Sequence, residues 1–181
     1  MKLFIKIVYI VLFSILLIYV ALPEPQFPLP PSDSIQSNEP ADTESSLRRA
    51  YFTNYTREEV MNHYKEQFSK SSAFGIPFPT YSFNYPPEES QTIIRDQTRS
   101  TFLEEIVHPF RESIYVNGFE PKTEKDAIFI EGRSWRQKII IKYSGSKTII
   151  RVSIILLTSI FALLIVKELL KFLKELKFKS K

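Results

Sequence analysis

Residues 152–166 read VSIILLTSIFALLIV, a run without a charged side chain. A helix buried in the core of a small soluble domain normally keeps a polar face, and this run shows none over about four turns. Arg151 and Lys167 bound the run, and both side chains are long enough to extend toward lipid headgroups. Because about 20 apolar residues span the hydrocarbon core of a bilayer, we expect a transmembrane helix over residues 148–170.

A second apolar run lies near the N-terminus, where residues 7–22 read IVYIVLFSILLIYVAL. Two lysines near its start would also suit the charged beginning of a cleaved secretory signal. Signal cleavage usually needs small residues two positions apart, whereas Ala21 is preceded at that spacing by Tyr19. We therefore expect residues 1–22 to form an uncleaved signal anchor, with a cleaved signal as the alternative.

The charges that flank the two runs indicate how the chain crosses the membrane. Lysines precede the first run and Glu24 follows it, while six lysines follow the second run. Cytoplasmic flanks of membrane helices are enriched in Lys and Arg, so we expect a two-pass protein with both termini in the cytoplasm. The basic tail at residues 171–181 is expected either to lie on anionic lipid or to be a plain stop-transfer flank.

The formal net charge of +4 is unevenly distributed along the chain. Residues 23–147 carry 15 Lys and Arg against 18 Asp and Glu, a net charge of −3, so the two ends together carry +7. A nucleic-acid-binding surface needs clustered basic residues on the domain itself, and we expect no nucleic-acid partner. The chain has no cysteine, which excludes disulfides, thiolate metal sites and a cysteine nucleophile.

Residues 23–46 are rich in proline, and six of the twelve prolines lie between Pro23 and Pro40. Proline removes amide donors and favours extended backbone, so this segment is predicted to form a semi-rigid stalk. The stalk would connect the first membrane helix to an extracytoplasmic domain at residues 47–147.

The domain begins with a clear helix signal. Thr56 and Glu59 form a capping box, which predicts an amphipathic helix over residues 57–69. Residues 80–85 alternate between aromatic and polar side chains, as expected of a strand.

A long helix is predicted over residues 88–117, kinked near Pro109, because Phe102, Ile106 and Phe110 recur at helical spacing. A hairpin is then predicted from residues 127–131 and 135–143. The predicted fold class is α+β, with two terminal transmembrane helices that flank a small domain. The elements of this domain are expected in the order helix, strand, long helix, strand, strand, and its helices are expected to pack on one face of the sheet.

The two histidines are the candidates for chemistry, because each follows a glutamate by four positions. That spacing places both side chains of a pair on one helix face. If the two predicted helices packed together, nitrogen and oxygen ligands could converge on a metal; the candidate set is Glu59, His63, Glu104, His108 and Glu112. The simpler interpretation is a pair of solvated ion-pair faces. A hydrolase using Glu104 and Glu105 is a further alternative.

Aromatic residues are concentrated between positions 51 and 85. Most can fill the core of the domain, but so many in a small volume favour a binding surface as well. Because a strand over residues 80–85 puts Tyr81, Phe83 and Tyr85 on one face, these three are the candidate partner-binding residues.

The chain carries neither a G-x-S-x-G motif nor a phosphate-binding loop. We therefore expect a non-enzymatic, membrane-anchored extracytoplasmic binding or scaffold module, with the lipid bilayer and a membrane or envelope protein as partners and no cofactor. The alternative is a membrane-anchored metal-binding protein or hydrolase centred on His63 and His108. A channel is less favoured, since neither predicted membrane helix has an ionisable residue in its interior.

Overall fold

The computed structural model describes residues 2–70, 72–73, 76–95 and 97–179. The chain divides into two compact units. The helical unit comprises Met1–Pro23 and Ser146–Lys181, and the sheet domain comprises Glu24–Gly145.

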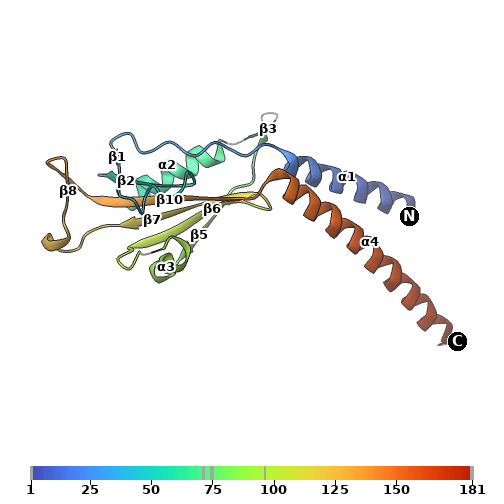
Figure 1. Ribbon diagram of the computed structural model, residues 1–181. Helices are drawn as coiled ribbons and strands as arrows, with labels where there is room; N and C mark the ends of the chain where they lie inside the picture. The colour runs from blue at the N-terminus through green and yellow to red at the C-terminus, as the bar shows by residue number, and fades with distance from the viewer. Residues whose placement is uncertain (1, 71, 74–75, 96, 180–181) are drawn as a thin grey trace. The chain divides into compact units, whose positions relative to one another are not determined.

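Two helices make up the helical unit, α1 (Lys2–Ala21) and α4 (Thr148–Lys179) (Figure 1). Both are long and apolar enough to cross a membrane, over Leu3–Ala21 and Thr148–Leu176. Their large apolar side chains are mostly exposed, which is unlike a core helix of a soluble protein. This supports the predicted membrane segments, and α4 continues as one helix through much of the expected basic tail.

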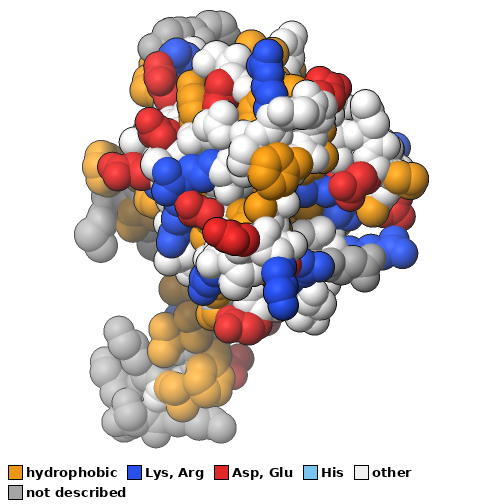
Figure 2. Space-filling model, turned by 90° about the vertical axis from the view of Figure 1, so that its left-hand side faces the viewer, with side chains coloured by type: hydrophobic (Ala, Val, Ile, Leu, Met, Phe, Trp, Pro, Cys, Tyr) orange, Lys and Arg blue, Asp and Glu red, His pale blue; other side chains and the backbone are white. Residues whose placement is uncertain are grey.

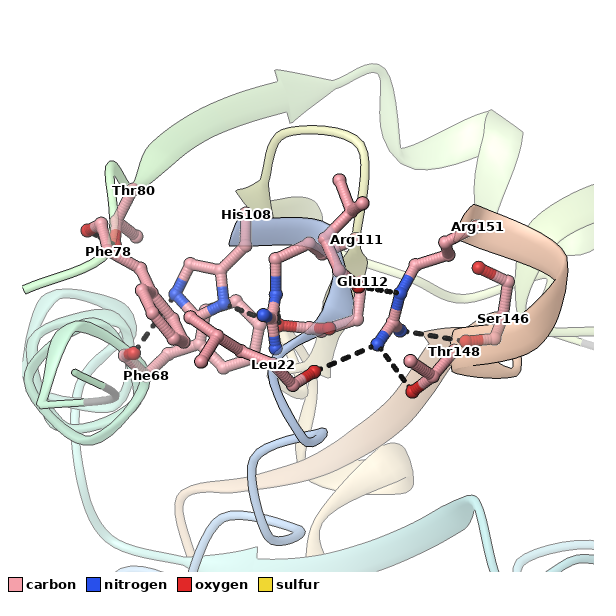
Figure 3. A network of polar contacts seen from close by, with 11 residues as sticks. Leu22, Phe68, Phe78, Thr80, His108, Arg111, Glu112, Ser146, Thr148 and Arg151 are labelled. Atoms are coloured by element: carbon pink, nitrogen blue, oxygen red, sulfur yellow. Dashed lines mark hydrogen bonds and ion pairs between the residues drawn. The ribbon is translucent and has the colours of Figure 1, made fainter. Parts of the chain in front are cut away.

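Arg151 connects the two helices of this unit. Its guanidinium donates to the carbonyl oxygens of Val20 and Leu22 at 3.1 and 3.2 Å, and to that of Ser146 at 2.7 Å (Figure 3). The last carbonyls of a helix lack intrahelical partners and carry the negative end of its dipole. A cation at this position therefore stabilises the C-terminal end of α1 and holds it beside α4.

A six-stranded sheet forms the body of the sheet domain, in the order β1-β2-β10-β7-β6-β5 (Figure 1). Each neighbouring pair of strands is antiparallel. The strand bounds are Ile35–Gln36 for β1, Arg48–Thr53 for β2, Tyr81–Tyr85 for β5, Phe102–His108 for β6, Glu112–Phe119 for β7 and Gln137–Gly145 for β10.

The other elements of the domain are shorter. Two small hairpins are formed by β3 (Ser72–Ala73) with β4 (Ile76–Pro77), and by β8 (Ile128–Ile130) with β9 (Arg133–Trp135). The helices are α2 (Arg57–Ser69), α3 (Ser90–Ile93) and the 3₁₀ turns η1 (Pro87–Glu89) and η2 (Glu124–Asp126).

Helix α2 covers one face of the sheet. Its buried side chains are Val60, Met61, Tyr64 and Phe68, and they pack on strand residues that include Ile106, Ile114, Ile139 and Ile141. On the opposite face a smaller cluster joins Ile94, just after α3, to Ala50, Leu103 and Ile140. Thus α2 and α3 lie on opposite sides of the sheet, so the expectation that the helices pack on one sheet face is wrong (Figure 1). The larger core cluster lies on the α2 side.

The structure confirms the α+β class, the capped helix at residues 57–69 and the strand that ends at Tyr85. The long helix predicted over residues 88–117 is wrong, and with it the predicted order of elements. Those residues form η1, the single turn α3 and then the hairpin β6–β7. Phe110, expected with Phe102 and Ile106 on the apolar face of that helix, is 72% exposed at the hairpin turn, with a φ of 62°.

The hairpin predicted from residues 127–131 and 135–143 is correct in part. Strands β8 and β9 pair around a turn at Gly132, which has a φ of 74°. The long strand that follows, β10, pairs instead with β2 and β7 in the centre of the sheet.

The proline-rich segment, expected to be a stalk, lies on the sheet domain. Strand β1 pairs with β2, and the side-chain amide of Gln67 on α2 bonds both backbone groups of Leu29. The N–H of Leu29 donates to Gln67 Oε1 at 2.8 Å, and Gln67 Nε2 donates back to the Leu29 carbonyl at 3.1 Å.

Candidate functional site

Strand β5 is an open edge of the sheet. It bonds to β6 on one side, and among the described residues no strand pairs with its other side. An edge strand presents backbone N–H and C=O groups that another chain can pair with. The opposite edge, β1, is only 2 residues long, against 5 for β5. The longer exposed edge therefore lies at β5.

Aromatic side chains of β5 line one face of this edge. Tyr81 is 56% and Phe83 is 50% exposed, whereas Tyr85 is half-buried. Their register partners on β6 are Val107, Glu105 and Leu103, respectively. Directly opposed residues of an antiparallel pair share a face, so the three aromatic residues lie in one row, as the sequence alternation predicts. The row is on the α3 side of the sheet, where Tyr85 packs against the Leu103 cluster.

Glu105 anchors one end of this row. The hydroxyl of Tyr85 donates to Glu105 Oε2 at 2.6 Å, and this bond raises the pKa of Tyr85 to about 12. Burial, followed by a hydrogen bond to the same carboxylate, raises the pKa of Tyr115 to about 12. Sequence reasoning missed Tyr115, because it placed the residue in a helix. Glu105 thus holds two tyrosines beneath the open edge, and its neighbour Glu104 points to the opposite face of the sheet.

The candidate metal ligands are mostly engaged with different partners. Glu59 caps α2, where backbone and hydroxyl hydrogen bonds from its cap residue lower its pKa. Glu104 forms an ion pair with Arg57 at 2.7 Å. His63 Nε2 lies 2.9 Å from the carbonyl of Leu29. Across the described part of the chain, no group of three or more His, Cys, Asp or Glu side chains is arranged to hold a metal ion.

His108 and Glu112, the other two candidates, do meet, in a buried cluster at the end of the β6–β7 hairpin (Figure 3). His108 is fully buried, with Nδ1 2.8 Å from Glu112 Oε1 and Nε2 3.1 Å from the carbonyl of Phe68. Arg111 Nε donates to the same Glu112 oxygen at 3.1 Å. The four-residue spacing reflects pairing across the hairpin, where His108 and Glu112 are register partners, and not a helical turn.

The His108 ring is held on both sides. Each of its ring nitrogens lies within hydrogen-bonding distance of an oxygen, one of a carboxylate and one of a backbone carbonyl. The ring also stacks on Phe68, with centroids 3.9 Å apart and planes 7° from parallel. Phe68 lies in the last turn of α2. The cluster therefore joins α2 to the hairpin.

A surface hollow of about 530 Å³ lies between α2 and the proline-rich segment. Leu29, His63 and Gln67, which connect these two elements, form part of its lining.

On the face of the sheet domain shown in Figure 2, acidic and basic side chains are interspersed.

Comparison of the chain with protein-family models, with curated proteins and with solved structures gives no match. The case for any function therefore rests on the geometry of this chain.

Proposed function

We propose that this protein is a non-enzymatic, membrane-anchored binding module that holds its sheet domain outside the cytoplasm and docks a strand of a membrane or envelope protein on β5. The observation that carries the proposal is the open β5 edge, with Tyr81 and Phe83 exposed beside it. In strand addition, backbone hydrogen bonds supply affinity and alternate side chains supply specificity. Exposed aromatic side chains are also the residues that most often anchor interfaces.

The helical unit supports the membrane part of this proposal. Its two helices are long enough to span a bilayer, and the lysines that flank them favour cytoplasmic termini. Arg151 bonds carbonyls at the end of α1, which favours an α1 that is retained as an anchor over a cleaved signal.

The alternative of a metal site or hydrolase at His63 and His108 has weaker support. The two histidines bond different elements, the Leu29 carbonyl and the Phe68 carbonyl. His108 is fully buried and held on both ring nitrogens, an arrangement that suits a structural role.

Co-purification of the tagged full-length protein from native membranes tests the proposal. We expect a stoichiometric protein partner that is lost when Phe83 is replaced with Ser. Phe129, which is 69% exposed on β8, gives the matched control, and Phe129→Ser is expected to retain the partner. If both variants retained the partner, β5 would not be the docking edge. A stoichiometric metal, lost on replacing either histidine, would favour the alternative.

A further inference from the structure

The sequence of β5 has an internal symmetry. Tyr81, Ser82, Phe83, Asn84 and Tyr85 alternate aromatic and small polar side chains, and the pattern is the same in both chain directions. The aromatic residues lie on one face of the sheet and the polar residues on the other. From Tyr81 to Asn84 the side chains are exposed, so most of the edge is accessible from both faces.

Antiparallel pairing of two such strands about Phe83 matches every position. Phe83 faces Phe83 of the second copy, and Tyr81 of each copy faces Tyr85 of the other. On the opposite face Ser82 meets Asn84, a pair that can hydrogen-bond. Aromatic pairs and hydrogen-bonding polar pairs are the side-chain combinations that stabilise neighbouring strands. A two-fold interface of this kind requires a surface that is complementary to itself, and β5 meets that requirement.

We propose that the partner of β5 is a second copy of this chain, whose β5 pairs antiparallel with it in the register centred on Phe83. The proposal rests on the proposed function, because it names the partner of the same docking edge. The six-stranded sheet is then continuous with that of the second copy, and the two aromatic rows lie side by side on one face.

Prolines on either side of β5 restrict the register. Pro79 lies two residues before the strand, and Pro86 follows it directly. Proline cannot donate a backbone hydrogen bond to a ladder. The register centred on Phe83 pairs all 5 residues of each strand, whereas a slip of two positions loses pairs and brings prolines against the partner.

Charge determines the direction of pairing. Glu88 and Glu89 follow β5 and are exposed, and the strand itself has no charged residue. Parallel pairing would place these acids beside those of the second copy, and like charges directly opposite are destabilising. In the antiparallel register they instead face the uncharged segment at Pro77 and Phe78. Antiparallel pairing therefore avoids the repulsion.

A disulfide experiment tests the pairing directly, because the chain has no cysteine of its own. Full-length Phe83→Cys is purified in mild detergent, where neither copy's anchor restricts the other, and is oxidised with copper phenanthroline. Opposed residues on neighbouring strands have Cβ atoms about 4.5–5.5 Å apart, close to the separation in a disulfide. We expect a covalent dimer on a non-reducing gel. Phe129→Cys is the control for crosslinking by random collision between molecules, and it should give several-fold less dimer.

The direction of pairing is tested with two differently tagged variants, Tyr81→Cys and Tyr85→Cys. The mixture is expected to form a mixed dimer. Tyr81→Cys alone is expected to form little dimer, because equivalent positions are then four residues, about 13 Å, apart along the strands. Equal dimer from Phe83→Cys and Phe129→Cys, or efficient dimer from Tyr81→Cys alone, would overturn the proposal.

A photo-crosslinking residue at position 83, applied in native membranes, separates this proposal from the proposed function. Capture of the same chain supports self-pairing. Capture of a different protein overturns self-pairing and leaves the docking function of β5 intact. No capture at all, together with no disulfide dimer, overturns both.

Discussion

Glu104 and Glu105 lie next to each other in a buried strand because each carboxylate has partners on its own side of the sheet. Glu104 pairs with Arg57 and Lys65 on the α2 side, and Glu105 accepts from Tyr85 on the other. A buried carboxylate is tolerated when it is paired and hydrogen-bonded. The two adjacent acids therefore point to opposite faces of the strand.

Phe110 allows a prediction about stability at a single residue. Its side chain is 72% exposed and its φ is 62°, a left-handed conformation that glycine adopts without strain. We expect Phe110→Gly to leave the free energy of unfolding unchanged or raise it by up to about 1 kcal/mol. Ile114→Ala, at a fully buried position, should lower it by about 2–5 kcal/mol.

Denaturant unfolding of the full-length protein, followed by the fluorescence of its single tryptophan, Trp135, measures both changes. A loss from Phe110→Gly as large as that from Ile114→Ala would place Phe110 in the core after all.

The two tyrosines that share Glu105 allow a prediction about pH. The pKa of Tyr85 and that of Tyr115 are each raised to about 12 in the folded protein, against about 10 in an unfolded chain. A raised pKa means that the folded state favours the protonated hydroxyl. The stability from these groups is therefore fully present below pH 10 and is lost as the pH rises through about 12.

An absorbance titration of tyrosinate should show three residues ionising later than the exposed tyrosines: Tyr85, Tyr115 and Tyr64, whose pKa is raised by burial. Tyr85→Phe should remove one late ionisation and reduce the loss of stability between pH 10 and 12. Ionisation of every tyrosine near pH 10 in the folded protein would contradict the hydrogen bonds to Glu105.

Among the elements, α2 and the β6–β7 hairpin differ in how well the sequence predicts them. The cap of α2 is a local signal, and Thr56 with Glu59 forms the capping box that their spacing predicts. In the hairpin, Phe102 and Ile106 recur every four residues, a spacing that fits a helix face and also one face of a strand. Pairing with another part of the chain determines that this segment is a strand and not a helix, since Ile106 faces Ile114 on β7 and Phe102 faces Gly118.

The candidate sites also differ in how well the sequence predicts them. The aromatic row of β5 follows from alternation within one strand and is present in the structure. The pairing of His108 with Glu112 depends on a turn between two strands that local periodicity assigned to a helix. The part played by Phe68 could not be predicted, because its carbonyl comes from an element 40 positions earlier in the chain.

The connection between α2 and the hairpin predicts a large effect at His108. Replacing His108 with Ala would leave the buried Glu112 without its imidazole partner and open a cavity beside Phe68. We expect the free energy of unfolding to fall by about 3–5 kcal/mol. His63→Ala, on the outer side of α2, is the matched control and should cost about 1 kcal/mol for its hydrogen bond. Thermal melts that place both variants equally near wild type would contradict the structural role of the cluster.

At the scale of the whole molecule, the arrangement of the chain across the membrane determines which partners β5 can meet. If both termini are cytoplasmic, β5 faces envelope or extracellular proteins; if the topology is reversed, it faces cytoplasmic ones. The six lysines after the second apolar run favour the first arrangement. Because the chain has no cysteine, single cysteines can report the side of the membrane on which each segment lies.

We expect Ser46→Cys, at an exposed position of the sheet domain, to react with a membrane-impermeant maleimide in intact cells. Ser180→Cys, beside the C-terminal lysine, should react only after the membrane is permeabilised. The two variants control for each other, since each reacts in one compartment. The reverse pattern would place the sheet domain in the cytoplasm. It would exclude a different envelope protein as the partner of β5 and leave self-pairing possible, because both copies would share the reversed topology.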